Sequence, residues 1–150
     1  MIVGRFADPF GRPFFQARVA LPRLGLIGPV AFLFDTGADI SLLTTDAASG
    51  LPLDVSRLER SSGAIGVGGG LTSTYAEPAM LGFDGADGQL YGFKLMLHIA
   101  EPQPMTASLP SLLGRDITDR WSIRYAPRLG LLEAAVLDAD GVLPARSQGA

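Results

Sequence analysis

Glycine and proline occur so often along this chain that they limit every regular element to a short length. The 150 residues include 19 Gly and 11 Pro, and neither residue gathers into a linker that would divide the chain into two domains. Mainly apolar segments of strand length lie between them, namely Phe14–Leu21, Pro29–Phe34, Ile40–Leu43, Trp121–Tyr125 and Leu129–Val136, and a short helix is expected over Arg115–Arg120. The pattern predicts one domain of about eight short strands and one or two short helices, which is typical of an all-β barrel or sandwich. Pro29–Phe34 is almost wholly apolar, which predicts a central strand buried on both faces.

The composition restricts the chemistry that the chain can perform. Apolar residues make up 47% of the sequence, whereas charged residues make up 18% and give a net charge of -3. The chain therefore lacks the basic surface that nucleic-acid binding usually needs. It has no Cys and a single His, His98, so it offers little for a zinc site or a thiolate nucleophile. We expect no cofactor and no metal, and any catalysis to use carboxylates, hydroxyls and backbone groups.

Both ends of the chain and its longest apolar run bear on the cellular location of the protein. The apolar run Leu24–Phe34 is short and is interrupted by glycine and proline, so it does not suit a membrane span. Residues 1–5 lack the charged and then apolar pattern of a secretory signal. We therefore expect a cytoplasmic protein without membrane partners, with one domain over residues 1–140 and a flexible tail over residues 141–150.

A single Asp-Thr-Gly triplet, Asp35–Gly37, follows the apolar segment that ends at Phe34. An Asp at the end of a buried strand suits a tight turn, in which the glycine lets backbone N–H groups approach the carboxylate. Peptide hydrolysis by water needs a general base and a general acid, and one carboxylate cannot serve as both in one step. A two-fold axis would supply a second Asp35 from a second chain, and two carboxyl groups so close would share a proton.

Four of the five residues from Gly66 to Gly70 are glycine, and β-type segments flank them on both sides. Because glycine adopts positive φ angles without strain, this region predicts a mobile hairpin. An ordinary flexible loop is the simpler alternative.

Two further patterns have structural interpretations. Phe83-Asp84-Gly85 echoes the earlier motif but lacks the Thr, so we expect it to form a hairpin tip. Trp121, Ile123 and Tyr125 alternate along one face of a predicted strand, which favours core or dimer contacts.

Three motifs in this order resemble the retropepsin-like aspartic proteases, the family of retroviral proteases and their bacterial relatives. They are Phe34–Asp39, the glycine-rich hairpin and Leu112–Asp116 (Leu-Leu-Gly-Arg-Asp), and the resemblance spans residues 12 to 135. It implies a closed all-β barrel with a glycine-rich flap hairpin and one short C-terminal helix, which opens at the last motif. It also implies a homodimeric endopeptidase that binds an extended peptide and cleaves it with a water activated by two Asp35 side chains.

The resemblance assigns a role to each matching residue. Asp35 is the catalytic carboxylate, Thr36 braces the equivalent loop of the second chain, and the Gly37 carbonyl contacts substrate. Asp39 pairs with Arg115 and ties the catalytic loop to the last helix. The implied substrate-binding residues are Ala38, Asp39, Ile40, Leu42, Gly66, Val67, Gly68, Gly69 and Leu112, and the implied structural residues are Gly114, Arg115 and Asp116.

The chain departs from the family pattern at several points, including an extra run of glycine in the flap and a tighter spacing at Pro110-Ser111-Leu112. The C-terminal part is longer than in retroviral enzymes, whose terminal strands interleave in the dimer, so the resemblance does not define the dimer contacts here. Position 38 is Ala, which offers no hydroxyl to stabilise an ionised pair of carboxylates, and we expect peak activity at weakly acidic pH.

Two other functions fit the sequence less well. A catalytically silent retropepsin-fold module for dimerisation or peptide binding is the main alternative. The other is phosphoryl transfer through an aspartyl-phosphate, but the chain lacks the strand-to-helix glycine loop that would hold the phosphate.

Overall fold

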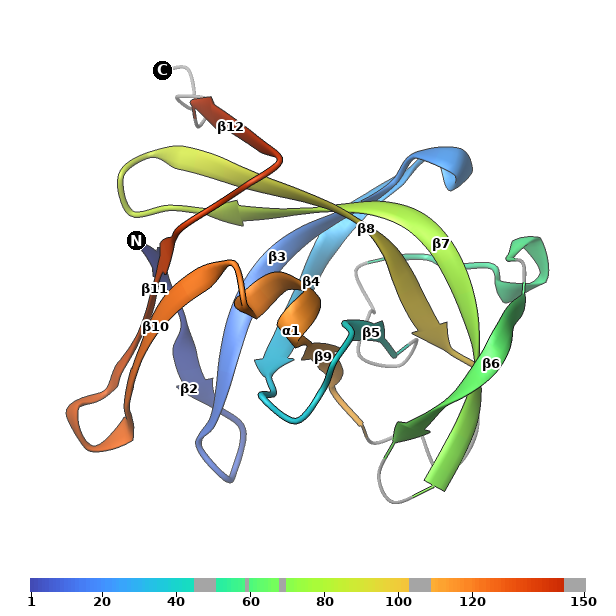
Figure 1. The fold of residues 1–150 in the computed structure, drawn as a ribbon, viewed down its shortest axis with the longest axis horizontal. Coiled ribbons are helices and arrows are strands. Elements are labelled where there is room, and N and C mark those ends of the chain that lie inside the picture. Colours follow the sequence, from blue (N-terminus) through green and yellow to red (C-terminus); the bar gives the residue numbers. More distant parts are fainter. Residues whose placement is uncertain (45–50, 59, 68–69, 103–108, 145–150) are drawn as a thin grey trace.

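The computed structural model describes residues 1–44, 51–58, 60–67, 70–102 and 109–144, with side chains left out over 60–73. Figure 1 shows that strands dominate this part of the chain and curve around a common interior. The expected all-β class is therefore confirmed. None of the helices in the described ranges has the length and apolar character needed to cross a membrane.

The described part of the chain forms twelve strands and four short helical elements. The helical elements are the 3-10 helices η1 (Pro22–Leu24), η2 (Val55–Arg57) and η3 (Pro127–Leu129), and the α-helix α1 (Arg115–Thr118). The strands are β1 (Ile2–Val3), β2 (Arg5–Ala7), β3 (Arg12–Leu21), β4 (Leu26–Phe34), β5 (Leu42–Leu43), β6 (Arg60–Val67), β7 (Gly70–Asp84), β8 (Gln89–Ala100), β9 (Ser111–Leu113), β10 (Trp121–Ala126), β11 (Leu131–Val136) and β12 (Gly141–Pro144).

Nine strands form the larger sheet, in the order β12-β8-β5-β9-β4-β3-β7-β6, with β2 added beside β3. Strand β7 also pairs with β8, so the series of neighbours from β8 through β5, β9, β4, β3 and β7 returns to β8. The smaller sheet has the order β1-β11-β10. This arrangement places the end of β4 beside β9, the strand that leads into α1.

Aromatic side chains fill the interior around Trp121, the first residue of β10. The Trp121 ring meets those of Phe15, Phe83 and Phe93 edge-on, with centroid distances of 5.3, 4.9 and 5.8 Å. The three phenylalanines have no exposed surface. Edge-to-face contacts of this kind add to the stabilisation from burial alone. The core therefore joins β10 to the larger sheet.

Strand β4 differs from the prediction that both of its faces are buried. It occupies the expected central position between β3 and β9, but it begins at Leu26 and its burial alternates. Val30 and Phe32 are buried, whereas Ile27 is 70% exposed and Phe34 is partly exposed. A continuous apolar run predicts two covered faces, yet among the described residues the outer face of this strand stays partly exposed.

Several element boundaries also differ from the prediction. The strand expected over Ile40–Leu43 is limited to β5, and the helix expected over Arg115–Arg120 ends at Thr118. The strand expected from Leu129 starts at Leu131, because η3 and a left-handed Gly130 (φ 62°) precede it. The tail expected over residues 141–150 starts with β12, which pairs antiparallel with β8, and residues 145–150 lie outside the described residues.

Candidate active site

Asp35 lies in a tight turn at the end of β4. The Asp35 N–H donates to the Leu113 carbonyl (3.3 Å), and the Ala38 N–H donates to the Asp35 carbonyl (3.2 Å). The Gly37 N–H donates to Asp35 Oδ1 (2.9 Å) and so fixes the orientation of the carboxylate. A Cβ at position 37 would lie 3.2 Å from that oxygen, so a side chain there would push the carboxylate by a few tenths of an ångström. Asp35 is half-buried, and Thr36 and Gly37 are exposed.

Backbone hydrogen bonds hold this turn against the start of α1. The Arg115 N–H donates to the Ala38 carbonyl (2.8 Å), and the Asp116 N–H donates to the Asp39 carbonyl (3.2 Å). The side chains of Arg115 and Asp39 form an ion pair as expected, and this contact holds the pKa of Arg115 above its usual value. Both side chains are well exposed, so solvent screens the pair and the backbone bonds provide most of the attachment.

A buried hydroxyl, that of Ser41, forms a second connection that none of the sequence motifs indicates. The Ser41 N–H donates to Asp116 Oδ2 (2.9 Å), and the Ser41 hydroxyl donates to Asp116 Oδ1 (2.7 Å). The Gly114 N–H in turn donates to Ser41 Oγ (3.0 Å), and Ser41 has no exposed surface. A polar residue between the apolar Ile40 and Leu42 was the signal that could have revealed this bond.

Gly114 allows the two segments to approach each other this closely. A Cβ at position 114 would lie 2.4 Å from the Ile40 carbonyl carbon and 2.8 Å from the Ser41 nitrogen. Both are backbone atoms, so a side chain could be accommodated only if one segment moved. The structural role expected for Gly114 thus has a specific steric reason.

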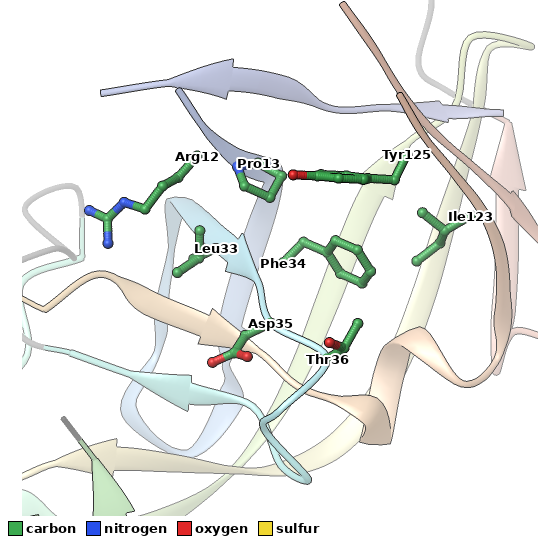
Figure 2. A pocket seen from close by; sticks show the side chains of 8 residues that line it. All are labelled: Arg12, Pro13, Leu33, Phe34, Asp35, Thr36, Ile123 and Tyr125. Carbon is green, nitrogen blue, oxygen red and sulfur yellow. The ribbon is translucent and has the colours of Figure 1, made fainter. Parts of the chain in front are cut away.

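An open cavity of about 660 Å³ adjoins Asp35. Figure 2 shows Asp35 and Thr36 on one side, the Phe34 ring in the middle, and Pro13 and Tyr125 opposite. Among the described residues that line this cavity, Asp35 supplies the only carboxylate. No sequence motif assigns the other lining residues to the site, namely Arg12, Pro13, Leu33, Phe34, Ile123 and Tyr125. They come from strands far apart in sequence, so no local pattern brings them together.

The residues expected to bind substrate are spread over three regions. Ala38, Asp39 and Ile40 continue the Asp35 turn, and Ile40 is partly exposed. Leu42 packs with Ala100 and the partly buried Leu112, and with 1% of its surface exposed it offers no surface to a substrate.

The glycine-rich hairpin is present in the backbone as strands β6 and β7. Val67 pairs with Gly70, and Gly66 pairs with Leu71. Gly68 and Gly69, the expected flap tip, lie outside the described residues. The role of this hairpin as a flap stays a prediction.

The described residues contain no group of three His, Cys, Asp or Glu side chains placed to hold a metal ion. Asp84, at the end of β7, pairs with Arg18 across the strands (2.9 Å). Its position at a hairpin agrees with the structural interpretation of the Phe83-Asp84-Gly85 echo.

Comparisons with known proteins found chains of similar fold among the solved structures. No family model matches the chain, and no curated protein matches it. Similar solved structures include the EIAV protease complexed with the inhibitor HBY-793, at 25% identity and a TM-score of 0.47, covering 75% of this chain and 90% of that one. They also include a retropepsin-like aspartic protease from Rickettsia conorii, at 20% identity and a TM-score of 0.49, covering 84% of each chain.

Proposed function

We propose that this protein is a retropepsin-like aspartic endopeptidase that acts as a homodimer. The observation that carries the proposal is the position of Asp35. Its carboxylate is oriented by the Gly37 N–H, and it lies at the side of an open, mainly apolar cavity. Three further contacts fix its loop to the segment that opens α1, at Ala38, Asp39 and Ser41. An aspartate with a purely structural role in a turn would not need to be held by so many hydrogen bonds beside an open apolar cavity.

The proposed reaction uses the Asp35 side chains of two chains, which share one proton. One carboxylate removes a proton from a water molecule, whose oxygen forms a bond to the peptide carbonyl carbon. The other carboxyl group donates its proton to the carbonyl oxygen. When this intermediate collapses, the C–N bond breaks and the leaving amine nitrogen receives the proton that the first carboxylate took from the water. The second carboxylate recovers its proton from a hydroxyl of the intermediate, which becomes the carboxyl group of the product.

The neighbouring residues position the reacting groups in this proposal. Thr36 is exposed, as a brace to the equivalent loop of the second chain would require. The Gly37 carbonyl and Ala38 to Ile40 contact the extended peptide, and residues Gly66 to Gly69 close over it and exclude water.

Replacement of Asp35 tests the proposed catalysis. We expect Asp35→Asn to abolish cleavage of an unstructured protein, because the neutral amide cannot act as the base. Asp84→Asn is the matched control, since Asp84 follows a phenylalanine and precedes a glycine but pairs with Arg18 away from the cavity. It should retain activity, and a statine-type transition-state mimic should inhibit both the parent and the control.

The outcomes separate the proposal from its main alternative. If Asp35→Asn cleaves as fast as the parent, the dyad is not the catalyst. If the parent binds peptide and dimerises but cleaves nothing over a broad pH range, the chain is a catalytically silent binding module.

A further inference from the structure

Three glycines lie side by side on three neighbouring strands of the larger sheet. Gly82 on β7 pairs with Gly92 on β8, and Gly92 pairs with Gly141 on β12. Leu81 and Phe93, next to them in sequence, have no exposed surface and belong to the core. Because side chains alternate between the two faces of a strand, the three glycines belong to the opposite, outer face of the sheet. This glycine row therefore carries no side chain of its own.

A small apolar cavity of about 180 Å³ lies over the glycine row. Met80 and Leu90 line it from either side of the row. The Met80 side chain leans toward β8, because a Cβ at Gly92 would lie 3.2 Å from Met80 Sδ. The Leu90 side chain leans toward β7, because a Cβ at Gly82 would lie 3.2 Å from Leu90 Cδ1. Sites for drug-sized molecules measure about 300–1,000 Å³, so this cavity suits a smaller ring system.

Arg18 provides the only charged side chain among the described residues that line this cavity. It lies on β3 in register with Gly82, so it closes the glycine row at the end away from β12. Its guanidinium donates to both oxygens of Asp84 through one nitrogen, Nη2 (3.0 and 2.9 Å), and in the described part of the chain its other nitrogens have no acceptor. A guanidinium presents five N–H donors in a planar fork, so Arg18 can bind a further carboxylate while it stays paired with Asp84.

The floor and walls of the cavity suit an aromatic ring. A row of glycines leaves a surface of bare backbone, and aromatic side chains compensate for glycines at sheet edges. The Met80 thioether makes favourable contacts with rings. Ile27 and Leu143, which also line the cavity, are 70% and 63% exposed, so an apolar occupant would remove apolar surface from water. Residues 145–150, which follow β12, contain no aromatic or large apolar residue and do not match this cavity.

We propose that this cavity is a second binding site, which takes a small planar aromatic carboxylate. The ring system lies on the glycine row, and the carboxylate accepts hydrogen bonds from Arg18, whose charge is complementary to it. A cationic ligand would meet the like charge of Arg18, and an uncharged ring would leave its donors unused. No residue lines both this cavity and the cavity beside Asp35, so the site is separate from the proposed catalysis.

Titration of the parent chain with naphthalene-2-carboxylate, followed by NMR of the backbone amides, tests the proposal. We expect saturable shifts of the Gly82, Gly92 and Gly141 signals, with a dissociation constant of about 1 mM or below for a ligand of this size. The Gly37 and Gly114 signals, from the catalytic loop and the start of α1, should not move. Naphthalene-2-methanol lacks the carboxylate and should bind at least about 10-fold more weakly. Octanoate lacks the rings and should also bind more weakly, and equal binding of either compound would contradict the proposal.

Substitutions in the cavity give an independent measurement. Arg18→Gln removes the charge and should raise the dissociation constant of naphthalene-2-carboxylate by about 10-fold or more. Arg124→Gln is the matched control, because Arg124 forms a similar cross-strand ion pair with Glu133 (2.9 Å) and does not line the cavity. Equal affinities of these two variants would contradict the proposal. Gly141→Leu should block the cavity, since a Cβ at position 141 would meet nothing within 4 Å, and if this variant fails to fold, the two arginine variants decide.

The binding site and the catalytic proposal can fail separately. Asp35→Asn should bind naphthalene-2-carboxylate as tightly as the parent, whether or not the parent cleaves peptides. Loss of binding in Asp35→Asn, or shifts confined to Gly37 and Gly114, would place the compound in the cavity beside Asp35 and overturn the proposal. Shifts of the glycine row that follow the protein concentration and not the added compound would show that a second copy covers the cavity, which would also overturn it.

Discussion

Replacement of Ser41 by alanine removes the buried connection between the catalytic loop and α1. The substitution deletes the hydroxyl that donates to Asp116 Oδ1 (2.7 Å) and leaves the buried Gly114 N–H without its acceptor. A hydrogen bond to a charged group contributes about 1.5–3 kcal/mol, and an unsatisfied buried donor costs about 1–3 kcal/mol. The Ser41 N–H still donates to Asp116 Oδ2, so we expect a net loss of about 3 kcal/mol in the free energy of unfolding.

Thermal and denaturant unfolding measure this loss. For a domain of this size, about 3 kcal/mol corresponds to a decrease of roughly 6–12 °C in Tm. Ser56→Ala is the matched control, because the Ser56 hydroxyl also donates to a carboxylate, Asp54 Oδ1 (2.6 Å), but at an exposed site. We expect this control to change stability by less than about 0.5 kcal/mol. If both variants lose the same stability, burial does not strengthen the Ser41 contact and the reasoning is wrong.

Three further substitutions test other parts of the structure. Gly114→Ala should destabilise the fold by about 1–3 kcal/mol or more, measured by urea unfolding, because its Cβ would collide with backbone atoms. A loss clearly below about 1 kcal/mol would contradict the steric argument. The hydrogen bonds from Arg120 and from the Lys94 N–H hold the pKa of Asp140 below its usual value. That contribution to stability is present above the unfolded pKa near 4 and is lost as the pH falls through the folded pKa. The difference in Tm between the parent and Asp140→Asn should therefore shrink below pH 4. A difference in Tm that stays constant with pH would refute the assignment. Ala38→Ser adds a hydroxyl beside Asp35, and we expect the pH–rate profile for peptide cleavage to move toward acid, whereas an unchanged profile would show that position 38 does not tune the dyad.

Local sequence determined the turns and the β-rich character of the chain. The tetrapeptide Pro-Arg-Leu-Gly occurs twice, at Pro22–Gly25 and Pro127–Gly130, and both copies form a 3-10 turn that ends in a left-handed glycine, with φ of 64° and 62°. Proline fixes the first φ angle and glycine permits the last, so the same turn forms in two different surroundings. The strands around these turns could be predicted for the same reason. The order of the Asp35 motif, the glycine-rich hairpin and the Leu112–Asp116 motif likewise indicated the family resemblance from sequence alone.

Tertiary structure alone decided which residues meet at the site and which faces are covered. The partners Ser41 and Asp116 are 75 residues apart, and the cavity beside Asp35 combines residues from β3, β4 and β10. Strand β4 has a continuous apolar sequence but alternating burial, because coverage of a face depends on which distant strands pack against it. The sequence thus determined the elements and the chemistry of the Asp35 turn, whereas long-range pairing determined the buried network and the cavity beside Asp35.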